Sequence, residues 1–153
     1  MKKLCAFVIF LAVSIPLCSC SARYESSERV VRIFAEAYGI DGRIYSSLAK
    51  EWTDGYIEPS LKSTMFSRTE LLPYDYTLLI HSRLDSVFEL GVFLANSARE
   101  RGELSEMCYE RIMLLASMSD SEGRVLMRDN LVVYFFTSDT KRVEECLNKA
   151  LRA

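Results

Sequence analysis

The chain has 153 residues, of which 50% are hydrophobic and 26% charged, a balance typical of a globular protein rather than a disordered one. It carries 19 lysines and arginines and 21 aspartates and glutamates, for a net charge of −2. This mild acidity argues against nucleic acid as a partner and against electrostatic docking on an anionic membrane.

The first twenty residues have the pattern of a secretory signal peptide. Lys2 and Lys3 form a positively charged n-region. The apolar run that follows is shorter than the roughly 20 residues of a membrane-spanning helix. The run ends in Leu17-Cys18-Ser19-Cys20. Leucine three positions before a cysteine, with serine directly before it, resembles the lipobox of bacterial lipoproteins. We therefore predict a signal peptide over residues 1–19.

This resemblance implies that Cys20 becomes the first mature residue and carries a diacylglycerol on its sulfur. Two acyl chains give stable membrane anchoring, whereas one chain alone gives marginal binding. Residues 20–27 would then form the lipidated cysteine and a polar tether, and seven extended residues reach at most about 25 Å. The prediction is a lipid-anchored protein on the extracytoplasmic face of the cell membrane. An ordinary signal peptide or an uncleaved N-terminal anchor is the alternative.

Removal of the signal peptide leaves a single small domain over residues 28–153. The mature chain of 134 residues has 17 basic and 21 acidic side chains, because Lys2 and Lys3 are lost, and its net charge is therefore −4. Of the five cysteines, only Cys108 and Cys146 belong to the domain. Outside the cytoplasm they either form a disulfide or remain buried thiols on two apolar helix stripes.

Hydrophobic periodicity predicts the elements of this domain in chain order. Helical spacing runs over residues 28–38, between a cap at Ser26 or Ser27 and a stop at Gly39. A weaker helical period follows over 44–52, and residues 53–67 are irregular.

Beyond Pro73 the apolar period changes from helical spacing to alternation. We predict strands over 74–81 and 87–94, a long helix over 98–118, strands or one broken strand over 125–137, and a last helix capped by Ser138 or Asp139. The fold class is α+β: a small antiparallel or mixed sheet of three to four strands, two long helices packed on one face, and an N-terminal helix.

Aromatic residues are the best candidates for a binding surface. Tyr45, Trp52 and Tyr56 fall in the irregular part of the domain, where packing within a strand does not explain them. They are predicted to bind a carbohydrate or a peptide, and the alternative is ordinary core packing.

Residues with catalytic or metal-binding chemistry are sparse. His81 is the only histidine. Glu89 interrupts an apolar strand. It is either a buried acid or base, a solvent-facing residue, or a charge that protects an edge strand against aggregation. Asp120, Glu122 and Asp129 lack the spacing of a calcium loop. No phosphate loop, GxSxG or CxxC motif occurs. We predict no catalytic residue, no metal and no cofactor.

The C-terminal half adds a second resemblance to that of the lipobox. A strand over 88–93, a helix, a strand over 132–135 and a closing helix through Val143 and Leu147 resemble small Firmicute-type lipoproteins with a domain of unknown function. The resemblance covers roughly residues 70–152. It implies no activity and no functional residue, because the family has none established.

Three functions are compatible with these observations. The first is a non-enzymatic accessory or protein-interaction module with a partner in the cell envelope. The second is a lipoprotein with a surface groove for a small molecule or peptide, and the third is an unrecognised hydrolase. An exposed apolar patch favours the first, a concave aromatic pocket the second, and clustered titratable groups in a cleft the third.

Overall fold

The computed structural model describes residues 23–83 and 86–153, so the predicted signal peptide over 1–19 and the predicted lipidation site Cys20 lie outside the described residues. The helices and strands are α1 (Ser27–Tyr38), β1 (Arg43–Ser46), α2 (Pro59–Met65), the 3₁₀ helix η1 (Thr69–Leu71), β2 (Tyr76–Arg83), β3 (Ser86–Leu94), α3 (Ala98–Ala116), β4 (Glu122–Arg128), β5 (Leu131–Thr137) and α4 (Thr140–Ala150).

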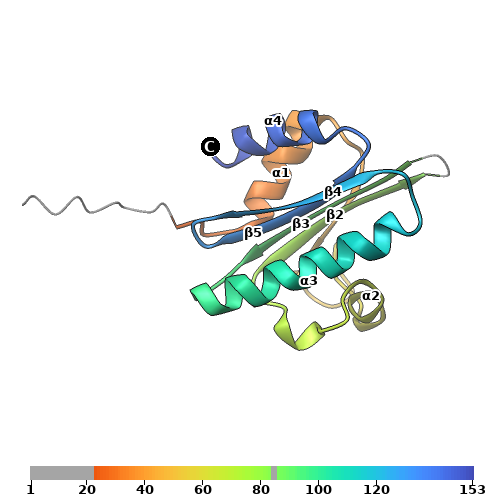
Figure 1. The fold of residues 1–153 in the computed structure, drawn as a ribbon. Coiled ribbons are helices and arrows are strands. Elements are labelled where there is room, and N and C mark those ends of the chain that lie inside the picture. Colours follow the sequence, from red (N-terminus) through yellow and green to blue (C-terminus); the bar gives the residue numbers. More distant parts are fainter. Residues whose placement is uncertain (1–22, 84–85) are drawn as a thin grey trace, which may run out of the picture.

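Within these residues, five strands form one sheet in the order β1-β2-β3-β5-β4, and all neighbours are antiparallel (Figure 1). The strand β3 lies at the centre of this sheet. Every residue of β5 is buried, so both faces of that strand need cover. The sheet is accordingly the middle layer of three.

Helices cover both faces of the sheet (Figure 1). On one face, α1 and α4 enclose a core that includes Val31, Phe34, Leu90, Phe135 and Leu147. On the other face, α3 and α2 enclose a second core that includes Met65, Phe93, Leu104, Met107 and Tyr134. Alternate residues of the central strands therefore point into two separate cores, one on each face of the sheet.

The predicted α+β class is confirmed, and its details change in two ways. The two long helices, α3 and α4, lie on opposite faces rather than on one face, because the apolar strand β5 must be covered on both sides. The sheet has five strands rather than three to four. The fifth is β1, where the sequence predicted a weak helical period: Ile44 and Tyr45 point to opposite faces of the sheet edge.

Side-chain caps set the beginnings of the helices as the sequence predicted. Ser26 accepts a hydrogen bond from the Arg29 backbone N–H (3.3 Å), and Asp139 accepts one from the Arg142 N–H (3.1 Å). Gly39 ends α1 in the left-handed conformation (φ 72°).

The two domain cysteines are separate thiols. Cys108 lies on α3 in one core and Cys146 on α4 in the other, so the sheet stands between them. Burial raises the pKa of the Cys108 thiol far above its usual range, which makes it a poor nucleophile at neutral pH. The sequence left open a disulfide or two buried thiols, and the structure shows two buried thiols.

A glycine in the central strand makes room for a tyrosine. Gly91 pairs directly with Tyr134 of β5, and a Cβ atom at position 91 would lie 2.2 Å from Tyr134 Cε1. Tyr134 is fully buried. Its ring covers the site that a side chain at position 91 would occupy, an arrangement known to compensate for glycine in a strand.

We predict that Gly91→Ala destabilises the domain by about 1–3 kcal/mol, because the new methyl group forces the Tyr134 ring out of place. Urea denaturation followed by circular dichroism measures the change. Gly102→Ala is the matched control: it lies within α3 with open space around it and should gain up to about 1 kcal/mol. Equal stabilities for the two variants would contradict the described packing.

Candidate functional site

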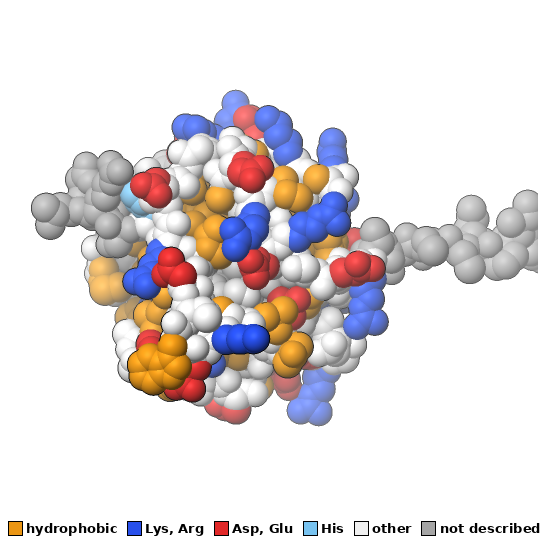
Figure 2. All heavy atoms as spheres, turned by 180° about the vertical axis from the view of Figure 1, so that it is seen from behind, with side chains coloured by type: hydrophobic (Ala, Val, Ile, Leu, Met, Phe, Trp, Pro, Cys, Tyr) orange, Lys and Arg blue, Asp and Glu red, His pale blue; other side chains and the backbone are white. Residues whose placement is uncertain are grey.

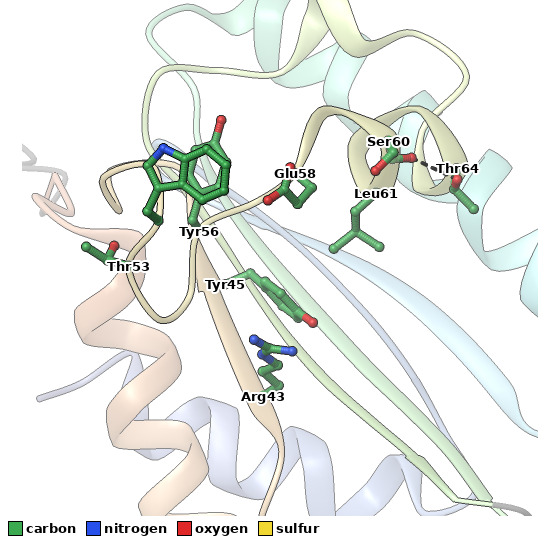
Figure 3. A pocket seen from close by; sticks show the side chains of 9 residues that line it. Arg43, Tyr45, Thr53, Tyr56, Glu58, Ser60, Leu61 and Thr64 are labelled. Carbon is green, nitrogen blue, oxygen red and sulfur yellow. Dashed lines mark hydrogen bonds between the residues drawn. The ribbon is translucent and has the colours of Figure 1, made fainter.

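Tyr45, Trp52 and Tyr56, predicted from the sequence as binding residues, line one hollow at the β1 edge of the sheet (Figure 3). The hollow has a volume of about 440 Å³ and is open to solvent. Its other lining residues are Arg43, Thr53, Glu58, Ser60, Leu61 and Thr64. We call this surface the aromatic groove. The structure thus brings together three aromatic residues from a strand and from the loop that follows it.

Strand β1 supplies one wall of the groove. Arg43 and Tyr45 lie two residues apart on the same face, opposite Ile80 and Leu78 of β2. The Arg43 guanidinium carbon lies 5.2 Å from the centre of the Tyr45 ring, close enough for a cation–π contact. This wall therefore offers a cation and an aromatic surface side by side.

The loop after β1 supplies the second wall, and turns hold it in place. Thr53 donates its backbone N–H to the Lys50 carbonyl (3.1 Å), and Tyr56 donates to the Thr53 carbonyl (3.2 Å). Gly55 adopts a positive φ of 84°, and a Cβ there would lie 2.9 Å from the Ile44 carbonyl oxygen. The loop can therefore lie against the strand only with glycine at this position.

Trp52 is the most exposed large side chain of the groove. Its side chain is 89% exposed, and its backbone adopts the left-handed conformation (φ 67°). For a bulky residue this conformation costs roughly 1–2 kcal/mol. Burial of the indole does not offset this cost, because the indole is in water. Trp52 is therefore an exposed aromatic residue that the loop holds at a local energetic cost.

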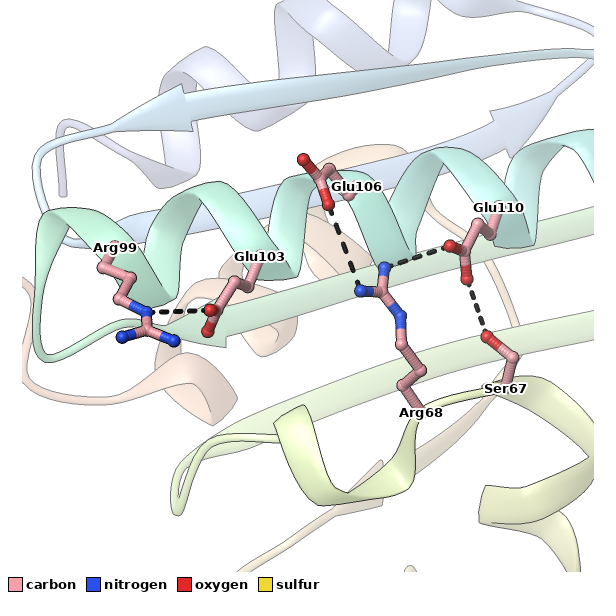
Figure 4. A network of polar contacts seen from close by, with 6 residues as sticks. All are labelled: Ser67, Arg68, Arg99, Glu103, Glu106 and Glu110. Carbon is pink, nitrogen blue, oxygen red and sulfur yellow. Dashed lines mark hydrogen bonds and ion pairs between the residues drawn. The ribbon is translucent and has the colours of Figure 1, made fainter.

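The helix α2 and the segment after it form the third wall. Phe66 packs edge-to-face on Phe93 and Tyr134 in the core. Figure 4 shows how the next residues are tied to α3: Arg68 pairs with Glu110 (3.0 Å), and Ser67 donates to the other Glu110 oxygen (2.6 Å). These contacts fix α2, and with it Leu61 and Thr64, relative to the sheet.

The aromatic groove also has a link to the buried core through tyrosines. Burial, with a smaller effect from the nearby Tyr56 phenol, raises the pKa of Tyr76 to about 12. Tyr76 is buried in the core formed by α3 and α2, and its hydroxyl has no hydrogen-bond partner among the described residues. Tyr56 therefore lies between solvent and the apolar interior, with the neutral Tyr76 phenol near it.

The other candidates from the sequence do not form a catalytic or metal site. His81 Nδ1 donates to the Asp41 carbonyl (2.6 Å), which ties β2 to the segment before β1. Glu122 begins β4 and Asp129 follows its other end, so they do not converge. Among the residues that the structure describes, no group of histidine, cysteine, aspartate and glutamate is arranged to hold a metal ion.

Glu89 is a buried member of an ion pair. It is 2% exposed and faces α3, where Arg111 donates two hydrogen bonds to its oxygens (2.8 and 2.7 Å) and Tyr134 donates a third. Burial alone would lower the pKa of Arg111, but the hydrogen bonds and charge of Glu89 raise it. Burial and the Glu89 carboxylate raise the pKa of Tyr134 well above its usual value. The cluster thus ties α3 to the two central strands of the sheet.

We predict that Glu89→Leu destabilises the domain by about 3–5 kcal/mol, because it leaves the Arg111 charge and the Tyr134 hydroxyl without their partner. The combined variant Glu89→Leu, Arg111→Met, Tyr134→Phe removes all three polar groups and should recover most of that loss. Urea denaturation measures both. A combined variant no more stable than Glu89→Leu alone would contradict this account.

No protein-family model, curated protein or solved structure matches the chain. None of the described helices has both the length and the apolar character needed to cross a membrane. The groove must therefore be interpreted from its own chemistry.

Sequence analysis identified the aromatic residues of the groove but not their neighbours. Arg43 and Leu61 reach the groove through the pairing of β1 with β2 and the docking of α2, and neither contact has a local sequence signal. Gly55, which marks a turn in the loop between Trp52 and Tyr56, was the available local signal.

Proposed function

We propose that this protein is a membrane-anchored lipoprotein on the extracytoplasmic face of the membrane, a non-enzymatic module that binds another envelope protein through the aromatic groove. The anchor is the diacylglycerol on Cys20 that the lipobox pattern predicts. The observation that carries the binding role is Trp52, fully presented to solvent in a strained conformation beside Tyr45 and Tyr56.

The shape of the groove favours a polypeptide over an enclosed small molecule. The hollow is open, and its lining mixes aromatic rings with Arg43, Glu58 and hydroxyl groups, so a ligand would remain largely in contact with solvent. Small-molecule sites usually bury most of their ligand. Aromatic residues and arginine are also the residues most enriched at protein interfaces. Capture of a small ligand is the second candidate.

A second exposed apolar surface lies on α3 and supports a protein partner. The second half of this helix exposes Tyr109, Met113 and Leu114 to solvent, and Met118 is exposed just after the helix ends. Met113 and Met118 are 70% and 66% exposed, and methionine adapts well to irregular partner surfaces. These exposed apolar side chains along and just after one helix support a protein partner for this surface.

The anchor has a direct test. We expect Cys20→Ala to move the protein from the membrane fraction to the soluble fraction, because the alanine cannot accept the lipid. Fractionation with immunoblotting measures this, and mass spectrometry of the N-terminal peptide reports the lipid. Cys108→Ala, at a buried thiol of the domain, is the control and should stay with the membrane. A Cys20→Ala protein that remains membrane-bound would contradict lipid anchoring.

The groove is tested by cross-linking in intact cells. We expect Trp52→Ala with Tyr56→Ala to reduce the yield of the cross-linked partner by about tenfold, because aromatic interface residues contribute most of the binding free energy. Met127→Ala, an exposed apolar residue on the β4 edge, is the matched control and should change nothing. Recovery of monomer alone, with a small ligand in the purified protein, would instead support ligand capture.

A further inference from the structure

The described chain begins with a segment that is fastened to the domain. The Tyr24 backbone N–H donates to Asn130 Oδ1 (2.8 Å), and Asn130 Nδ2 donates to the Tyr24 carbonyl (3.0 Å). The Tyr24 hydroxyl also donates to the Leu151 carbonyl (2.9 Å). Three hydrogen bonds thus join Tyr24 to the β4–β5 turn and to the end of α4.

This attachment shortens the free tether. The sequence alone allowed a tether as far as Ser27, with a reach of about 25 Å. Tyr24 is four residue steps from Cys20, and four extended residues span at most about 14 Å, so a lipid on Cys20 lies within this distance of the attachment. A domain held so closely cannot turn freely above the lipid, because the Tyr24 end of the sheet must stay near the anchor.

The surface around Tyr24 has the composition of a membrane-contacting face. A hollow of about 490 Å³ is lined by Tyr24, Leu48 and Tyr74 together with Arg23 and the acidic residues Glu25 and Asp75, among others. Tyr74 is 84% exposed and Leu48 45% exposed. Tyrosine has an apolar ring and a polar hydroxyl, which suit the boundary between headgroups and acyl chains.

Arginines adjoin this hollow, although the whole mature chain is acidic. Arg23 and Arg101 line a neighbouring hollow together with Asp129, and Arg128, the last residue of β4, lies 4.0 Å from the Asp129 carboxylate. Figure 2 shows Lys and Arg side chains along its right-hand edge, the side on which the described chain begins, with acidic side chains among them. Guanidinium groups bind phosphate oxygens well, so this end suits phospholipid headgroups better than the overall charge suggests.

We propose that the end of the domain around Tyr24, with Tyr74, Leu48 and Arg23 on its surface, rests against the phospholipid headgroups of the membrane that holds the anchor. This inference depends on the proposed lipidation of Cys20. The occupant of the surface is the bilayer itself, because the short free tether brings it there without any further partner.

Fluorescence quenching by brominated lipids tests the contact. Trp52 is the only tryptophan, so Trp52→Phe leaves a silent background into which one reporter is placed. Tyr74→Trp reports on the proposed face, and Ser138→Trp, an exposed residue after the far end of β5, is the matched control. The full lipidated chain is reconstituted in phosphatidylethanolamine–phosphatidylglycerol vesicles whose acyl chains carry bromine near the headgroups.

We expect the Tyr74→Trp reporter to lose about half of its emission in the brominated vesicles and to shift to shorter wavelength, with Ser138→Trp unchanged. If both reporters lost the same fraction of their emission in a lipidated, vesicle-bound protein, this inference would be overturned. The proposed lipid anchor would not be affected by that result. Absence of lipid on Cys20, seen by mass spectrometry, would overturn both proposals.

A further variant tests the attachment at Tyr24. Asn130→Ala with Tyr24→Phe removes its three hydrogen bonds and lengthens the free tether. We expect quenching of the Tyr74→Trp reporter to fall while binding to the vesicles is retained. Unchanged quenching would overturn the conclusion that the short tether holds this face against the lipid.

Discussion

The buried ion pair between Glu89 and Arg111 constrains the rest of this structure more than any other interaction. Two charges removed from water are tolerated only when their hydrogen bonds are satisfied, and here Arg111 and Tyr134 together satisfy the carboxylate. Only one placement of α3 on the sheet brings Arg111 to this point. The two hydrogen bonds from Arg111 to Glu89 thus fix where α3 lies along the sheet.

The same constraint extends outward to the aromatic groove. Once α3 is fixed, Glu110 is fixed too: it directly precedes Arg111, is turned by about 100° around the helix, and holds Ser67 and Arg68. Ion pairs at such exposed positions contribute little to stability, about 0–1 kcal/mol. Their importance is geometric: they direct the segment that follows α2 and so position the α2 wall of the groove. A buried pair in one core thereby orders the aromatic groove at the sheet edge.

The sequence predicted those features that have a local physical cause. Capping by Ser26 and Asp139, the alternation that begins near Tyr76 and the apolar strand β5 all depend on neighbours along the chain. The strand β1 was missed because four residues carry too little periodicity, and its pairing with β2 decides its conformation. The same limit applies to Glu89: its partner lies 22 residues away, so the sequence left three interpretations open.

The positions of the tether and the groove together restrict what a partner can be. The strands run from the Tyr24 end of the sheet toward the β2–β3 hairpin, and β1 lies along one lateral edge between these ends. If the Tyr24 end rests on the lipid, the aromatic groove opens sideways, parallel to the membrane surface. The height of the groove above the lipid is then limited to the reach of the segment from Cys20 to Tyr24, about 14 Å at most, plus about half the length of a strand. A partner bound there must present its own segment close to the membrane, which is the geometry of a neighbouring membrane-bound protein rather than of a distant wall component.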